Sequence, residues 1–115
     1  MIEPTELVGS FVVEIGERQA WPFVGFCDNE PTPAVERRLY IDADVVVASP
    51  DGRHTEPGRN DVVSALLALN GLTVSEAETD KGQLRLSFDD GSALVVRGVA
   101  RADTVGEPWW FGQQA

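Results

Sequence analysis

The stretch that most constrains this chain is residues 81–98, which read KGQLRLSFDDGSALVVRG. Apolar side chains at Leu84, Leu86 and Phe88 alternate with polar ones, and this is the period of a strand with one buried face. The four residues that follow, Asp-Asp-Gly-Ser, tolerate a tight reversal, and the residues after them are again apolar. The sequence therefore predicts an antiparallel β-hairpin.

The length and composition indicate one globular domain. A chain of 115 residues can bury a single core, and its 43% apolar and 24% charged residues argue against a disordered chain. No apolar run approaches the roughly 20 residues of a membrane helix, and the first ten residues lack the basic residues of a signal peptide. Cys27 is the only cysteine, so no disulfide can form within the chain. We expect one domain, 1–115, in the cytoplasm.

Charge is the strongest feature of the composition. The chain has 9 basic and 19 acidic residues, a formal net charge of −10. Residues 1–36 hold seven acids and one arginine, and so carry −6 of that total. Such a surface repels nucleic acid and anionic lipid, and it attracts a basic protein or a cation. The simpler alternative is that the negative charge serves solubility alone.

Three further segments in the first half have β-strand patterns. Residues 7–14 predict a first strand. Residues 21–27 are rich in aromatic side chains but contain Pro22 and Gly25, which is typical of an edge strand or a folded-over loop. Two prolines make residues 28–33 a loop. Residues 37–48 predict the longest strand, because apolar residues recur at every second position.

A short helix is predicted between two loops. Asn60 is a suitable N-cap, residues 61–69 carry a wide apolar stripe, and Asn70-Gly71 is a stop signal. A helix of this length is unstable alone, so it must pack on the sheet. With strands at 72–78 and around 108–112, the expected fold class is α+β: a twisted antiparallel sheet of about six strands, with the helix on one face.

Two segments share the pattern L-x-G-x-x-V-x-E, at residues 7–14 and 69–76. Each is followed by further predicted strand. The pattern raises the hypothesis that a three-strand unit is duplicated. The alternative is that short strands in small β proteins resemble one another.

From Leu39 onward the order of features resembles an uncharacterised family of small actinobacterial domains of unknown function. The resemblance covers about two thirds of the chain, and the aromatic segment 21–27 departs from the family pattern. Similar small acidic proteins serve as immunity partners in bacterial toxin systems, so the resemblance implies protein binding and no catalytic residues. The matching segments are Leu39–Ile41, Leu66–Val74, Gly82–Gly91 (G-x-L-x-L-x-F-x-D-G) and Glu107–Gly112 (E-x-W-x-x-G).

Few residues are candidates for chemistry. Asp42 and Asp44 are two apart on the predicted strand and would share a face, where they could hold a divalent cation if a third acid were near; the alternative is a solvated face. Cys27 and His54 are the only possible thiol–imidazole pair, and no motif around either would activate it. No phosphate-binding glycine loop is present. We therefore predict no catalytic residue, no cofactor and no bound metal.

The aromatic residues are the remaining candidates for a site. Neighbouring tryptophans on a strand face opposite ways, so one of the pair 109–110 should be more buried than the other. Large aromatics on a partly exposed surface are enriched at protein interfaces; the simpler alternative is one more core strand with a tryptophan at its rim. The predicted partner-binding residues are Trp21, Phe23, Phe26, Trp109 and Trp110.

The functional prediction is a non-catalytic, immunity- or inhibitor-like module that captures a basic protein partner and binds neither nucleic acid nor membrane. One alternative is a self-associating structural protein, which would dimerise through an exposed strand beside Trp109 or Trp21. The other is a small metal-dependent enzyme that uses Asp42 and Asp44.

Overall fold

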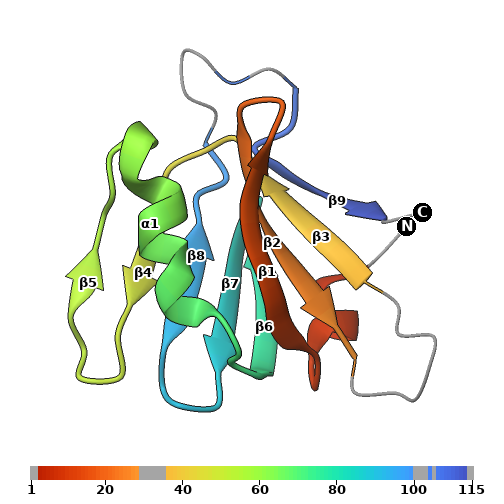
Figure 1. Cartoon of the computed structure of the whole chain (residues 1–115), viewed down its shortest axis with the longest axis vertical. Coiled ribbons are helices and arrows are strands. Elements are labelled where there is room, and N and C mark those ends of the chain that lie inside the picture. Colours follow the sequence, from red (N-terminus) through yellow and green to blue (C-terminus); the bar gives the residue numbers. More distant parts are fainter. Residues whose placement is uncertain (1–2, 29–35, 100–103, 105, 114–115) are drawn as a thin grey trace.

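A computed structural model describes residues 3–28, 36–99, 104 and 106–113. The loop predicted at 28–33 lies outside these residues except for Asp28. The described strands form two antiparallel sheets (Figure 1). Sheet A contains, in spatial order, β1 (Phe11–Arg18), β2 (Trp21–Cys27), β3 (Glu36–Ile41) and β9 (Trp109–Gln113). Sheet B contains β5 (His54–Thr55), β4 (Val45–Ala48), β8 (Ala93–Val96), β7 (Gln83–Phe88) and β6 (Val74–Asp80).

The fold is α+β as expected, but the prediction of one sheet of about six strands is wrong. The long strand predicted at 37–48 is broken at residues 42–44, where the chain crosses from β3 in sheet A to β4 in sheet B. Backbone hydrogen bonds hold this crossing: the Asp42 N–H donates to the Pro108 carbonyl (2.7 Å), and the Asp44 carbonyl accepts from the Arg97 N–H (2.9 Å). An alternating apolar pattern cannot reveal a change of sheet, because both sheets share one core.

The aromatic segment 21–27 is also placed differently from the prediction. It forms β2, an inner strand of sheet A between β1 and β3, and not an edge strand or a loop. Pro22 is tolerated because it pairs only with Glu17 of β1. Pairing with β3 begins at Phe23, so the proline lies beyond the part of the strand that has two neighbours.

The predicted hairpin at 81–98 is confirmed. β7 and β8 pair antiparallel, with Ser87 opposite Ala93. The Phe88 N–H donates to the Ser92 carbonyl (2.9 Å) and closes the turn. Gly91 has a φ of +92°, a conformation that glycine adopts without steric cost.

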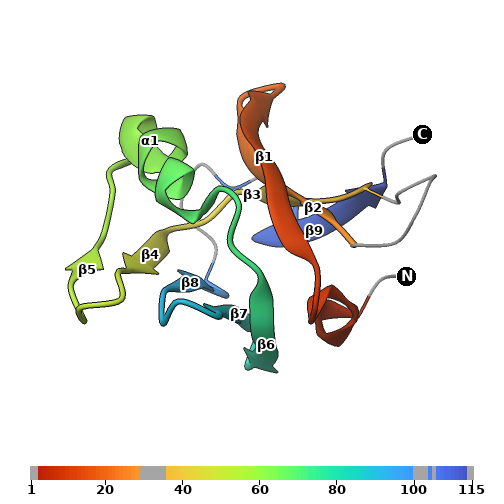
Figure 2. The ribbon, with the colours of Figure 1, turned by 60° about the horizontal axis from the view of Figure 1, so that its bottom comes forward.

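The predicted helix exists but is only partly α-helical. α1 covers only Val62–Leu66, and it is extended by 3-10 turns at Arg59–Asp61 (η2) and Leu67–Leu69 (η3). The expected Asn60 cap is wrong, because the residue that precedes α1 is Asp61 and makes no capping hydrogen bond. The helix contacts β1 and β2 of sheet A and β4 of sheet B, so it covers the opening between the sheets (Figure 2).

The first strand begins later than predicted. It begins at Phe11, where the two repeated segments pair with each other. Residues 7–14 do not form one strand: a 3-10 turn, η1 (Pro4–Leu7), comes first and β1 starts at Phe11. The two L-x-G-x-x-V-x-E segments lie antiparallel, and their fifth residues, Phe11 and Thr73, form a β-bridge. Four hydrogen bonds surround this bridge: Gly9 N–H to Val74 O (2.9 Å), Gly71 N–H to Val12 O (2.8 Å), Val12 N–H to Leu72 O (2.9 Å) and Val74 N–H to Ser10 O (2.8 Å). Exchanging the two segments leaves this set of bonds unchanged, as a two-fold axis would.

The equivalence extends along both halves of the chain. η1 and η3 both end at the leucine of the motif, and β1 and β6 both have a bulge between the sixth and eighth motif residues. The two-residue turns that follow, Gln19-Ala20 and Lys81-Gly82, all have positive φ. The described structure therefore repeats as well as the sequence, in a first half (residues 4–48) and a second half (residues 67–113).

The two halves exchange their last strands. β4 follows β3 along the chain but pairs with β8 of the second half, and β9 follows β8 but pairs with β3 of the first half. Each sheet therefore contains a strand from the other half. Both halves also contribute to one core, whose largest fully buried side chains are Leu7, Val12, Val24, Phe26, Leu39, Ile41, Val45, Leu66, Leu69, Leu84, Leu86 and Leu94.

If the halves are equivalent, the same substitution at equivalent turns should have the same cost. Gly9 and Gly71 have φ of +90° and +84°, with nothing within 4 Å of an added Cβ, so alanine at either costs only backbone strain. We expect each change to lower the free energy of unfolding by about 1–2 kcal/mol, measured by urea denaturation.

Gly58→Ala is the matched control, because Gly58 has an ordinary φ of −66°. It should change stability by no more than about 0.5 kcal/mol. A cost at only one of Gly9 and Gly71 would contradict the equivalence.

Candidate functional site

The outer face of sheet A carries a row of aromatic rings. Strand alternation places Trp21 and Phe23 of β2, Tyr40 of β3 and Trp110 of β9 on the face opposite the core residues. Trp21 meets Trp110 edge-on at 5.1 Å between ring centroids, Tyr40 stacks on Trp110 at 5.6 Å, and Phe23 lies 5.6 Å from Tyr40. We call these four residues the aromatic row.

Two glycines on neighbouring strands make room for these rings. Gly16 of β1 lies opposite Phe23, and a Cβ at Gly16 would be 2.8 Å from the Phe23 ring. A Cβ at Gly112 of β9 would be 2.7 Å from the Tyr40 ring. Each ring therefore lies directly over the backbone of a neighbouring strand, which fixes its orientation.

Arg38 of β3 anchors the row from one side. Its guanidinium lies 3.0 Å from a Glu14 carboxylate oxygen, 3.5 Å from one of Glu36, and 4.3 Å from the centre of the Phe23 ring. A third glycine makes this arrangement possible, because a Cβ at Gly25 would be 2.8 Å from the Glu36 carboxylate. Arg38 thus reaches across β2 to an acid on β1.

The neighbours of Arg38 stabilise its protonated, positively charged form. The hydrogen bond from its guanidinium to the Tyr40 hydroxyl (3.5 Å) and the attraction of Glu14 raise the pKa of Arg38, against the opposing effect of burial. The side chain is only 12% exposed. Arg38 therefore holds the Phe23 ring by a cation–π contact that does not depend on pH in the physiological range.

The predicted binding residues fall on two faces. Trp21, Phe23 and Trp110 belong to the aromatic row, where Trp21 and Trp110 are half-buried and Phe23 is 4% exposed. Phe26 is 1% exposed and lies in the core. Trp109 packs against the core, and its indole N–H donates to the Gly82 carbonyl (2.8 Å).

Sequence reasoning missed two members of the site. Tyr40 and Arg38 alternate with the buried Leu39 and Ile41, so the period of β3 already places them on the outer face. What the sequence could not show is that β3 lies between β2 and β9, which brings Tyr40 between Phe23 and Trp110.

The residues predicted for metal or thiol chemistry are not brought together. Asp42 (4% exposed) and the exposed Asp44 lie in the crossing between sheets and not on one strand face. No group of three His, Cys, Asp or Glu side chains that could hold a metal occurs among the described residues. Cys27 is in sheet A and His54 is in sheet B.

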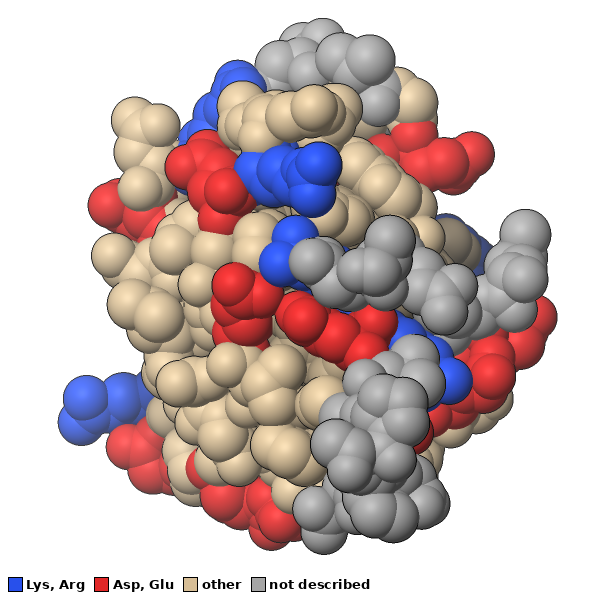
Figure 3. Space-filling view, turned by 45° about the vertical axis from the view of Figure 1, so that its right-hand side comes forward, with Lys and Arg blue, Asp and Glu red and all other residues tan. Residues whose placement is uncertain are grey.

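Charges of both signs lie around this face. Figure 3 shows acidic and basic side chains next to one another across the middle of the molecule, with acids along its lower edge. On the outer face of sheet A, Glu14 and Glu36 both form ion pairs with Arg38.

No helix in the described part of the chain is long and apolar enough to cross a membrane.

These features define a small α+β domain with a patch of aromatic rings on one sheet face. A family model described as a family of unknown function (DUF6188) matches residues 23–109, and the chain belongs to this family. The match confirms the resemblance to an uncharacterised domain family. A stretch of 49 residues, 43% of this chain and 72% of the other, is 39% identical to the copper chaperone CopZ of Staphylococcus haemolyticus. No solved structure matches the chain.

The contact between Phe23 and Gly16 can be tested by a double-mutant cycle. Gly16→Ala places a methyl group against a buried ring, so we expect it to lower the free energy of unfolding by about 1–3 kcal/mol in urea denaturation.

In a Phe23→Leu background the same change should cost markedly less, with a coupling of at least about 0.5 kcal/mol. An equal cost in both backgrounds would show that the ring does not lie over Gly16.

Proposed function

We propose that this chain is a non-catalytic protein-binding domain that captures a basic partner through the aromatic row. The observation that carries the proposal is the continuous contact of Trp21, Trp110, Tyr40 and Phe23 across three strands of one sheet face. Three of these side chains are half-buried, so they keep surface for a partner while their orientation is set by their neighbours.

Fixed aromatic rings are effective anchors for a partner. Tryptophan and tyrosine are enriched among the residues that contribute most to binding, because they bury much apolar area with few rotatable bonds. Here Gly16, Gly112 and Arg38 restrict the rings before any partner arrives. Pre-organisation of this kind lowers the entropic cost of binding.

The negative net charge of the protein favours basic partners through long-range attraction. The net charge of −10 attracts a basic protein and speeds the encounter, and this effect weakens as salt screens it. Close to the aromatic row the charges are mixed, so the specificity comes from the rings and their polar neighbours. The single cysteine agrees with a role in a reducing compartment such as the cytoplasm.

We do not propose copper binding for this chain, although part of it is similar to a copper chaperone. Soft thiolate ligands select Cu(I), and the sequence contains Cys27 as its only cysteine. The residues that the structure describes bring no set of potential metal ligands together. The described residues therefore offer no assembled set of donor atoms for a copper site.

The proposal is tested by capturing partners from a lysate of the source organism on the immobilised protein. A basic protein should be retained at low salt, and retention should fall as salt rises. Trp110→Ser should weaken binding of that protein at least about tenfold, as loss of a central aromatic anchor does.

Leu67→Ser is the matched control, since Leu67 is 56% exposed on the helical segment and outside the row. It should leave binding unchanged. Retention that ignores both salt and Trp110→Ser would refute the proposal.

Self-association is a second candidate, favoured by the position of β9. This strand is at an edge of sheet A, next to Trp109, whereas β2 with Trp21 is an inner strand and offers no free edge. Pairing of β9 with its copy across a two-fold axis would extend the sheet. Light scattering should then give twice the monomer mass of 12.5 kDa, and a monomer at all concentrations would exclude this candidate.

A further inference from the structure

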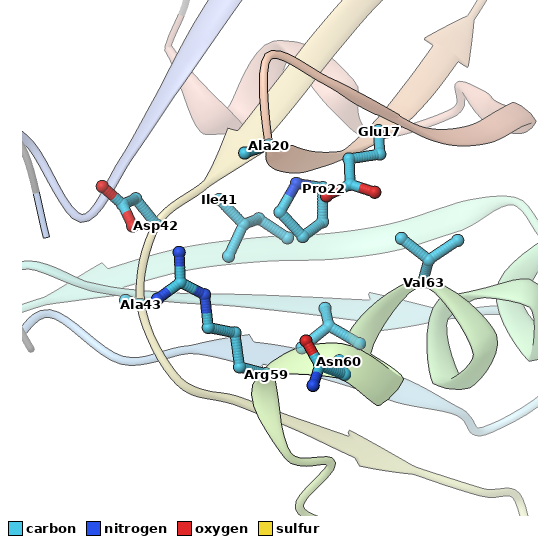
Figure 4. Close-up of a pocket in the computed structure, with 10 residues that line it drawn as sticks. Glu17, Ala20, Pro22, Ile41, Asp42, Ala43, Arg59, Asn60 and Val63 are labelled. Atoms are coloured by element: carbon cyan, nitrogen blue, oxygen red, sulfur yellow. The ribbon is translucent and has the colours of Figure 1, made fainter. Parts of the chain in front are cut away.

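A cavity of about 540 Å³ lies away from the outer face of sheet A. It is enclosed by the tip of the β1–β2 hairpin, the crossing from β3 to β4, and the start of the helical segment (Figure 4). Its volume is within the range of small-molecule sites. Six of the ten lining residues are apolar, whereas polar groups make up the larger share of the exposed wall. The lining comprises Glu17, Ala20, Pro22, Ile41, Asp42, Ala43, Arg59, Asn60, Val62 and Val63.

In the second half of the chain, the equivalent corner between hairpin tip and strand end is closed, because its two segments are in contact. Gly82 and Gly98 occupy the positions of Ala20 and Ala43, as the matching turns and strand registers show. A Cβ at Gly98 would lie 2.4 Å from the Gly82 backbone, so the two segments are in direct contact there. The Trp109 indole, bonded to the Gly82 carbonyl at 2.8 Å, completes the closure.

The fold therefore does not require a cavity at this corner. In the first half, Val45 stands at the position of Trp109, and its side chain has no N–H that could donate to the turn. The described residues of the second half also have no counterpart of Arg59, Asn60 and Val63 at their closed corner. The opening is a feature of this sequence and not of the architecture.

The lining favours a positively charged ligand. Two carboxylates and one guanidinium give the walls a net charge of −1, inside a protein of net charge −10. In Figure 4 the Arg59 side chain extends toward Asp42. The Glu17 carboxylate lies beside the Pro22 ring and faces the cavity. Glu17 thus presents its charge next to an apolar wall of Pro22 and Val63.

We propose that this cavity binds an alkylguanidinium or alkylammonium group, with its cation at Glu17 and its methylene stem along Pro22, Ile41 and Val63. Long cationic chains bury their stems on apolar surface while the charged head stays near water, and Glu17 is exposed at the rim. The group can belong to a free small cation or to a lysine or arginine side chain of a partner. This proposal does not need the aromatic row.

The probe is n-butylguanidinium, added to the full-length protein at constant ionic strength and followed by amide chemical shifts. We expect saturable shifts at residues 17–21, 41–43 and 59–63. Glu17→Gln should weaken the apparent affinity about two- to fivefold, the range that an exposed ion pair gives. Glu78→Gln, an exposed acid on β6 with the same change of charge, should leave it unchanged.

A second variant tests the cavity itself. Val63→Trp places an indole in the space and should abolish the shifts, whereas Leu67→Trp, on the exposed side of the same segment, should not. Butyrate and butanol should not bind. Shifts that scatter over the acidic surface without saturating, equal binding of butanol, or equal effects of Glu17→Gln and Glu78→Gln would overturn the proposal.

The same variants identify the source of the cation. If Glu17→Gln and Val63→Trp weaken both butylguanidinium binding and capture of a basic partner, the ligand is a side chain of that partner. If they weaken butylguanidinium binding alone, the ligand is a free small cation. Butylguanidinium is titrated without a partner, so this test of the cavity remains valid even if no partner is captured. If butylguanidinium does not bind, the proposal that the aromatic row binds a partner is unaffected.

Discussion

The backbone pairing between the two repeated segments joins the two sheets and holds their strands in register. Around the Phe11–Thr73 bridge, four hydrogen bonds join the start of β1 to the segment that leads into β6, and so connect the two sheets. Satisfying these polar groups within the fold allows both sheets to turn their apolar faces toward one core. Two equivalent hairpins, β1–β2 and β6–β7, start at this junction.

The aromatic row exists because three positions in sheet A have no side chain. Gly16 and Gly112 lie beneath the rings of Phe23 and Tyr40, and Gly25 lies beneath the ion pairs of Arg38. Glycine weakens a strand by its conformational freedom, but here the rings and the arginine cover the exposed backbone. A sheet face thereby becomes a patch of fixed aromatic surface, and the proposal of protein binding rests on that surface.

Local features were predictable from the sequence, and the ways in which segments meet were not. The hairpin of β7 and β8 follows from alternation and turn residues, and the helical segment at 61–69 follows from its apolar stripe. The crossing at residues 42–44 is invisible to such reasoning, since a strand that changes sheet keeps its alternation. The inner position of β2 was missed because Pro22 suggested an edge. Of the site, the three outward aromatics Trp21, Phe23 and Trp110 were predicted, whereas their contact with Tyr40 depends on strand order.

The exchange of β4 and β9 has a consequence for how the chain folds. β3 has its outer neighbour in sheet A only after residues 109–113 are present, more than 60 positions later in the sequence. Loop-closure entropy must be overcome before such distant pairs contribute, so folding should be slow and concerted, with few stable intermediates of one half. During synthesis, the first half must wait for nearly the whole chain, and its exposed β3 edge is the surface most prone to pairing with another molecule in that interval.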